Sequence, residues 1–156
     1  MPNSLSQLDE RARQVMRNAS QSALNLGHTE IEPGHVLLGI LDEGTGITAS
    51  CLRLIDRDFG LVRKELKNRM HPRMDMNSFG RLPHSRTTTQ VLEHASYEAV
   101  QSGVSLLSPA HLILGILRVP GTVAYATLEH LGVQIDDVRE DIMNELRQLP
   151  NQENAG

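Results

Sequence analysis

The sequence predicts an all-α protein built from two related halves, and two observations lead to this prediction. First, residues 15–66 align with residues 91–142 at a constant offset of 76 without a gap, and 14 of the 52 aligned pairs are identical. Unrelated segments would share roughly 3 identical pairs. Second, apolar residues recur at helical spacing in both halves, and no segment shows the alternation of a half-buried strand. We therefore expect eight helices in two four-helix repeats that are related by a pseudo-twofold axis.

Proline, glycine and polar residues mark the expected boundaries of these parts. The expected parts are a flexible leader at residues 1–8, a first repeat at 9–70, a linker at 71–84, a second repeat at 85–148 and a polar tail at 149–156. Together they form one compact domain, because a chain of this length holds one core. The spacing of apolar residues places the eight helices at residues 10–26, 33–42, 47–55, 59–70, 86–102, 109–118, 122–131 and 135–148.

The first helix of each repeat has clear start and stop signals. Asp9 and Ser85 precede these helices and are predicted N-caps, because their side-chain oxygens can accept from the free amides of the first turn. Gly27 and Gly103 follow the last helical residues, where glycine can adopt the left-handed conformation that closes a helix. The two first helices are thus expected to be equivalent in length and in capping.

The second helix of each repeat carries the best matched stretch, PGHVLLGIL at residues 33–41 and PAHLILGIL at residues 109–117. Both helices are apolar nearly all round, which predicts that they are buried. Gly39 and Gly115 each cost about 1 kcal/mol relative to alanine in a helix interior, so we expect close helix packing at both. We interpret His35 and His111 as structural groups that bond to neighbouring atoms, and with them the two glycines form the expected repeat core.

Composition excludes several classes of function. The net charge is −4 and aromatic residues make up 3% of the chain, which argues against nucleic acid as the main partner. No apolar run approaches the ~20 residues of a membrane span, and no secretory leader is evident, so we expect a cytoplasmic protein with no membrane partner. A single cysteine cannot form an internal disulfide. No metal or cofactor site is expected, because neither histidine has ligands at metal-binding spacing.

The repeat residues resemble a known family. The first copy reads LGHTEI at residues 26–31 and HVLLGIL at 35–41, and the second reads HLILGIL at 111–117. Further matches lie at residues 10–13 (ERAR), 43–49 (EGTGITA) and 131–133 (LGV). This pattern is similar to the Clp N-terminal repeat of ClpA- and ClpC-type AAA+ unfoldases, over about residues 8–146. The resemblance implies an all-α double Clp-N motif.

The resemblance also implies a function, which is to recruit adaptor proteins and unfolded or tagged protein substrates to an ATPase motor in cis or in trans. The module itself would have no catalytic activity, and the chain lacks the G-x-x-x-x-G-K-[ST] phosphate loop of a motor. We expect the partner-binding rim at the helix starts and at the corners beside them. Its predicted residues are Asp9, Glu32, Gly34, Ser85, Ser108 and Ala110.

One departure from the family pattern concerns phosphoarginine. ClpC-type modules carry a glutamate before the histidine of the second helix, and this carboxylate helps to hold phosphoarginine marks on substrates. Here those positions are Gly34 and Ala110. Glu32 lies two residues away in the first half, but Ser108 offers no charge in the second. We therefore predict weak or absent phosphoarginine binding, since a guanidinium needs a carboxylate partner.

Three other functions remain open at this point. The chain could be a free-standing regulator of the Clp machinery, with the same fold and no motor of its own. It could be a small histidine-dependent hydrolase, which requires a cleft with a strongly perturbed titrating pair. It could also be an acidic regulator that docks on a basic partner, in which case binding would weaken as salt is added.

Overall fold

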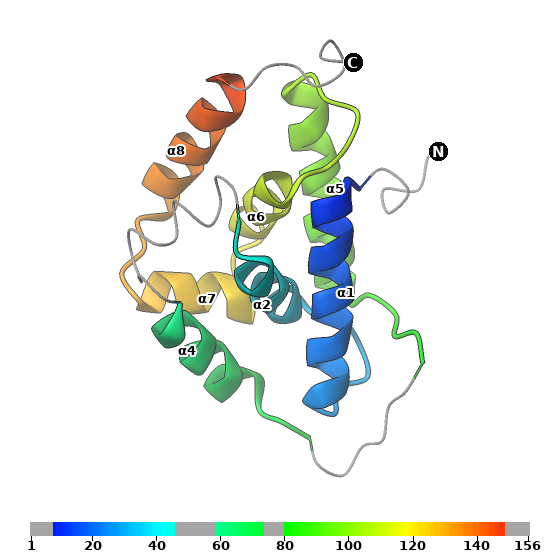
Figure 1. Cartoon of the computed structure of the whole chain (residues 1–156). Helices are drawn as coiled ribbons and strands as arrows, with labels where there is room; N and C mark the ends of the chain where they lie inside the picture. The colour runs from blue at the N-terminus through cyan, green and yellow to red at the C-terminus, as the bar shows by residue number, and fades with distance from the viewer. Residues whose placement is uncertain (1–7, 46–58, 74–79, 149–156) are drawn as a thin grey trace.

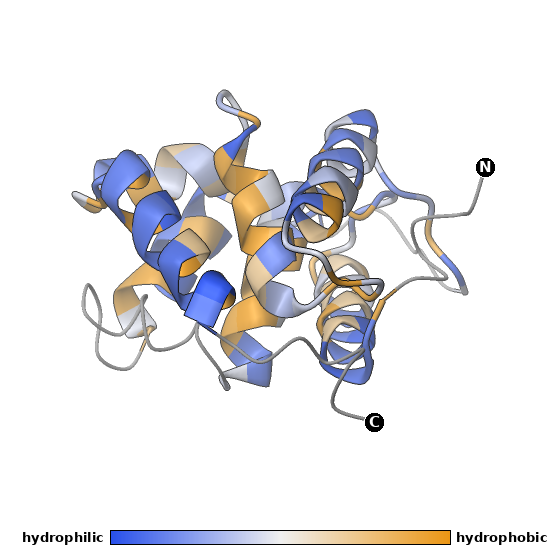
Figure 2. Ribbon diagram, turned by 90° about the horizontal axis from the view of Figure 1, so that it is seen from above, coloured by the Kyte–Doolittle hydropathy of each residue, from blue (hydrophilic) through white to orange (hydrophobic). Residues whose placement is uncertain are grey.

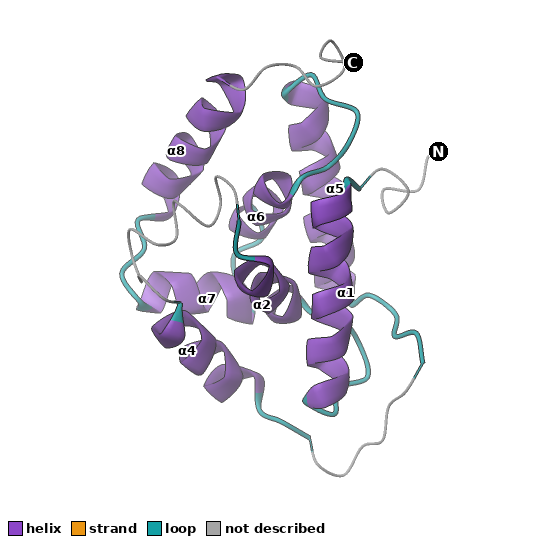
Figure 3. Ribbon diagram, viewed as in Figure 1, coloured by secondary structure: helices purple, strands orange, loops and turns teal. Residues whose placement is uncertain are grey.

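The computed structural model describes residues 8–45, 59–73 and 80–148, and these residues form an all-helical fold (Figure 3). The seven helices of the described residues are α1 (Glu10–Asn25), α2 (Pro33–Glu43), α4 (Gly60–Met70), α5 (Arg86–Gln101), α6 (Pro109–Leu117), α7 (Val123–His130) and α8 (Ile135–Gln148). The predicted all-α class is confirmed. The helix predicted at residues 47–55 lies outside the described residues. Seven helices are therefore described where eight were predicted.

The first helices of the two halves begin as predicted. The Asp9 carboxylate accepts from the Ala12 amide at 2.7 Å, and the Ser85 hydroxyl accepts from the Thr88 amide at 3.1 Å. Each bond satisfies one amide that a helix start leaves without an intrahelical acceptor. α1 and α5 both contain 16 residues, and their start positions differ by the offset of the sequence repeat.

Helices α2 and α6 are buried along nearly their whole length, as their sequences predict. α2 packs on α1, and α6 packs on α5. A Cβ at Gly39 would lie 2.3 Å from the carbonyl oxygen of Val15, and one at Gly115 would lie 2.3 Å from that of Val91. Such a contact is far inside van der Waals distance, so both pairs of helices approach closely enough that only glycine fits.

The starts of α1 and α5 are bonded to the opposite halves of the chain. The Asp9 amide donates to the Leu107 carbonyl at 2.8 Å, and the Ser85 amide donates to the Ile31 carbonyl at 2.9 Å. These two bonds join positions that correspond in the sequence repeat, so each half supplies an acceptor for the other half's first helix. Isolated parallel bridges accompany them, and the described residues contain no strand.

The described ends of the predicted linker pack against the first half. The Arg73 amide donates to the Leu26 carbonyl at 2.8 Å, and the Ile31 amide donates to the Pro83 carbonyl at 2.8 Å. Residues 71–73 and 80–84 are therefore held in place by backbone hydrogen bonds. These bonds position both segments beside the connection between α1 and α2.

The helices are arranged around α2 and α6, which lie at the centre of the molecule and contact each other (Figure 1). α1 and α5 cover one side, and α4, α7 and α8 cover the other. The apolar residues gather on the central helices and the hydrophilic residues on the outer ones (Figure 2). Within the described residues, no helix has the length and apolar character that crossing a bilayer requires.

Candidate functional site

A cavity of about 540 Å³ opens where the two halves meet, beside the start of α2. The first half supplies the connection between α1 and α2, the start of α2 and the end of α4. The second half supplies one residue of α5 and the start of α7. The lining residues are His28, Thr29, Glu30, Glu32, Pro33, Gly34, Arg69, Met70, His71, Arg73, Thr87, Gly121, Thr122 and Val123. The site is therefore shared between segments that lie far apart in the sequence.

A chain of hydrogen bonds through two imidazoles supports one wall of this cavity. The Glu32 amide donates to His35 Nδ1 at 2.8 Å, so the proton of this neutral imidazole resides on Nε2. His35 Nε2 then donates to His28 Nδ1 at 2.8 Å, and His28 Nε2 donates to the His71 carbonyl at 3.1 Å. This chain ties the start of α2 to the residue that follows α4. His71 has a φ of 51°, a strained backbone conformation for a residue with a side chain.

The pKa of His35 is lowered to about 4, first because burial disfavours the charged imidazole and second because His28 lies beside it. The His35 side chain is fully buried, whereas His28 lines the cavity. All four ring nitrogens of the pair already make hydrogen bonds, so neither ring offers a free base to a bound substrate. The hydrogen bonds of the perturbed imidazole, His35, are therefore structural.

The second half builds a different environment around the matching histidine. The Ser108 amide donates to His111 Nδ1 at 2.9 Å, as Glu32 does to His35. Val104 occupies the position that corresponds to His28. His111 Nε2 is buried and has no hydrogen-bond partner in the described residues. Burial lowers the pKa of His111 to about 4, although the carboxylate of Glu98 opposes this shift.

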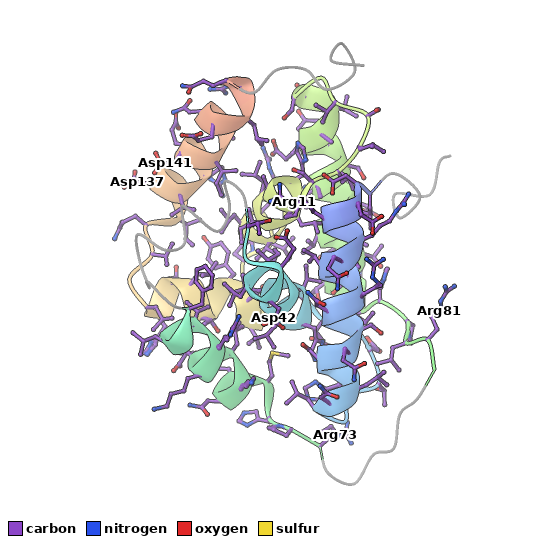
Figure 4. The ribbon with its side chains drawn as sticks, viewed as in Figure 1. Arg11, Asp42, Arg73, Arg81, Asp137 and Asp141 are labelled. Atoms are coloured by element: carbon purple, nitrogen blue, oxygen red, sulfur yellow. The ribbon has the colours of Figure 1, made fainter. Side chains whose placement is uncertain are left out.

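Met70 covers the position where the family pattern has a glutamate. A Cβ at Gly34 would lie 2.6 Å from Met70 Sδ, so the thioether occupies the space above this glycine. Arg69 and Arg73 line the cavity on the α4 side, and Arg73 is labelled at the lower edge of Figure 4. The carboxylates of Glu30 and Glu32 line it as well. The cavity thus presents charges of both signs around a methionine.

The sequence model of the Clp repeat (R) N-terminal domain matches residues 7–119 and again residues 84–156. The chain belongs to this family. The predicted resemblance is thereby confirmed, and the chain is a Clp N-terminal domain.

Similar proteins include parts of large Clp unfoldase subunits. The chain is 31% identical over 134 residues to the negative regulator of genetic competence ClpC/MecB of Bacillus subtilis (strain 168), an alignment that covers 86% of this chain and 16% of that protein. The Hsp104 N-terminal domain of Candida albicans has a TM-score of 0.74 at 17% identity, covering 92% of this chain and 93% of that one. The N-terminal domain of ClpD of Arabidopsis thaliana has a TM-score of 0.67 at 22% identity, covering 91% and 99%.

The structure places the six predicted rim residues in two separate groups. Glu32 and Gly34 line the cavity, and Ser85 lies beside them because its amide bonds to Ile31. The other group consists of Asp9, Ser108 and Ala110, since the Asp9 amide bonds to Leu107. This second group does not line the cavity between the halves. The six residues thus lie at two places, and their role as a partner-binding rim stays a prediction.

Two arginines contribute to the fold and were not predicted from the sequence. Arg63 Nη2 donates to the Leu41 carbonyl at 3.2 Å, and Arg139 Nη2 donates to the Leu117 carbonyl at 2.9 Å. Each guanidinium thus satisfies a carbonyl at the end of a buried helix, where intrahelical donors are missing. The signal in the sequence was the identical Val-Arg pair at residues 62–63 and 138–139.

The described residues, which leave out 1–7, 46–58, 74–79 and 149–156, hold no cluster of three or more histidine, cysteine or acidic residues placed to bind a metal ion. His28 and His35 form a pair without a third ligand. The chemistry that the cavity offers is recognition by charged groups, helix starts and one flexible thioether.

Proposed function

We propose that this chain is a cytoplasmic docking module that recruits adaptor proteins or protein substrates to a Clp-type ATP-dependent unfoldase and catalyses no reaction itself. The observation that carries the proposal is the cavity shared by both halves, in a chain of the Clp N-terminal domain family. Its mixed charges and its methionine suit contacts with varied polypeptides, because thioethers adapt to many shapes.

The motor belongs either to the same polypeptide or to a partner, in which case the chain is a free-standing regulator. The chain spans 16% and 17% of the length of two curated relatives that it matches. The size of the native protein in a lysate, measured with an antibody against this chain, distinguishes the two arrangements.

Blocking the cavity tests the proposal. Thr87 is half-buried in its wall, and Thr87→Trp would fill part of the cavity. Asn144→Trp places the same ring on the exposed surface of α8 and serves as the control. In pull-downs from native lysate, we expect the wild-type chain and Asn144→Trp to capture an unfoldase or adaptor, and Thr87→Trp to lose it. Equal capture by a folded Thr87→Trp variant, checked by circular dichroism, would contradict the proposal.

We further propose weak or absent binding of phosphoarginine. Gly34 and Ala110 carry no carboxylate, and Met70 lies over Gly34. Titration calorimetry with free phosphoarginine tests this, and two micromolar sites would overturn it. Gly34→Glu is the informative variant, because it restores the family's carboxylate at one of the two positions.

We also propose that the two halves are pseudo-twofold repeats with the boundaries 9–70 and 85–148, joined by a linker at 71–84. The equal offsets of the helix starts, of the two glycine contacts and of the crossed backbone bonds support this. An experimental structure in which residues 47–55 form the counterpart of α7 would complete the eight-helix arrangement.

A further inference from the structure

A second groove, of about 720 Å³, runs between α1 and residues 81–84 and shares no lining residue with the cavity described above. Its apolar lining comes from Leu8, Met16, Ile31 and Leu82, all of which are buried within the fold. Three arginines line it as well, Arg13, Arg17 and Arg81, and the remaining lining residues are Ser20, Pro83 and His84. The groove therefore combines an apolar floor with a cationic rim.

The positive charge of this rim is incompletely balanced. Glu10 lies 3.7 Å from Arg13 and 3.1 Å from Arg17, and its side chain is 75% exposed. Arg81 makes no ion pair with the described residues, and its side chain lies at the outer edge of the molecule (Figure 4). Among the residues that the structure describes, one exposed carboxylate thus pairs with two of the three cations, in a chain whose net charge is −4. Such a local excess of positive charge attracts anionic groups.

The fold does not require these arginines. Thr89 and Glu93 occupy the corresponding positions of α5, which forms a helix of the same length. Arg13 and Arg17 are exposed and contribute nothing to the buried face of α1. Because these two arginines occur on one repeat and not on the other, we infer that they have a role in recognition.

We propose that this groove binds a short polypeptide segment in which acidic and apolar residues alternate. The carboxylates would pair with Arg13, Arg17 and Arg81, while the apolar side chains would cover the floor. Nucleic acid fits the groove less well, because none of the described residues that line it is a phenylalanine, tyrosine or tryptophan on which a base could stack. This proposal does not depend on the proposed function, since it concerns a separate surface.

The test uses a short fluorescein-labelled peptide that alternates glutamate and leucine, with fluorescence anisotropy as the readout. Comparison probes are the lysine–leucine peptide, polyglutamate of equal length and a single-stranded oligonucleotide. We expect the glutamate–leucine peptide to bind most tightly and to weaken as salt is added. Amide chemical shifts should change at Leu8 and Leu82 on binding.

The decisive variant is Arg13→Thr/Arg17→Glu, which imports the residues of α5 and therefore suits a helix. It should weaken binding roughly tenfold, because each partly exposed charge pair contributes up to about 1 kcal/mol. Lys64→Thr/Lys67→Glu makes the same change of charge on α4 and should leave binding unchanged. Equal binding by the groove variant would overturn the proposal. So would tighter binding of the oligonucleotide, or binding of polyglutamate or the lysine–leucine peptide equal to that of the glutamate–leucine peptide.

Discussion

The two halves of this chain agree in their packing and differ in what surrounds their histidines. Gly39 and Gly115 meet backbone carbonyls at the same distance, and Arg63 and Arg139 bond to matching helix ends. In the first half, however, the buried imidazole donates to His28 beside an open cavity. In the second half the matching site holds Val104. The comparison teaches that the duplicated contacts maintain the fold, whereas binding chemistry is expected where the copies differ.

The neighbourhood of α5 shows a second difference between the halves. Glu98 is buried and lies 2.6 Å from Arg118 Nε, and the Arg118 guanidinium also lies 5.8 Å from the centre of the Tyr97 ring. The corresponding residues of the first half are a serine, an aspartate and a glutamine, so no such pair can form there. The second half therefore has an internal ion pair that the first half lacks.

The largest effect is expected at the duplicated glycines. Gly39→Ala and Gly115→Ala would each force a methyl group against a backbone carbonyl, so α1 and α2, or α5 and α6, would have to separate. We expect each to lower the free energy of unfolding by more than about 3 kcal/mol. Urea denaturation measures this, with Gly34→Ala as the control.

The control variant, Gly34→Ala, should lower the free energy of unfolding by less than about 1 kcal/mol, because its methyl group meets only the flexible side chain of Met70. If one of the two duplicated glycines tolerated alanine as well as Gly34 does, the packing of the two halves would not be equivalent.

Removing the partner of the buried carboxylate should have the next largest effect. Arg118→Ala leaves Glu98 buried without its cation, which should cost about 2–3 kcal/mol. This expected loss of stability is smaller than for a fully buried ion pair, because the Arg118 side chain is 39% exposed. Thermal unfolding measures the loss. Arg118→Lys should recover part of it, and an unchanged melting temperature in Arg118→Ala would show that Glu98 does not depend on this pair.

Stability should fall as the pH is lowered from about 6.5 to about 4. The pKa values of His35 and His111 are both lowered to about 4, whereas an unfolded histidine titrates at 6.5. The unfolded chain therefore binds more protons within this range, so the stabilisation is complete above 6.5 and is lost toward 4. We expect about 2 kcal/mol per imidazole between pH 7 and pH 5.

Asparagine variants separate the two histidines, since an asparagine oxygen can still accept the amide bond that Nδ1 accepts. His35→Asn and His111→Asn should each remove about half of the pH dependence that the two imidazoles produce, because burial lowers both pKa values to about 4. Urea denaturation at several pH values provides the comparison. An unchanged slope in one variant would contradict the contribution assigned to its imidazole.

The smallest effect is expected at the arginines that bond to the buried helix ends. Arg63→Ala and Arg139→Ala should each cost about 1 kcal/mol, since each removes one hydrogen bond to a carbonyl. Each also removes a partly exposed ion pair, with Asp42 or Asp136, which adds little. The loss should be similar in the two halves when measured by thermal unfolding. Arg147→Ala, an exposed position on α8, is the control and should change stability little.

The local features of this fold could be predicted from the sequence. The caps at Asp9 and Ser85 act within one helical turn, so residue type and spacing identify them. The close contacts at Gly39 and Gly115 could be predicted because the same unfavourable residue occurs twice.

The cavity could not be predicted in the same way. Its His28–His35 pair depends on how the connection after α1 folds back, and its floor depends on Met70 reaching Gly34 from α4. Both contacts are set by the path of the chain between helices, and no local spacing rule fixes that path. The same holds for the grouping of the six rim residues, which the crossed backbone bonds divide in two.

Those crossed bonds bear on how such a chain could have originated. A polypeptide with only one half would expose the amide before its first helix and the carbonyl before its second. Two identical copies could satisfy both groups by exchanging the same pair of bonds, which is the arrangement of an isologous homodimer. Joining the copies end to end would fix that association in one molecule and free each former subunit to change its surface separately.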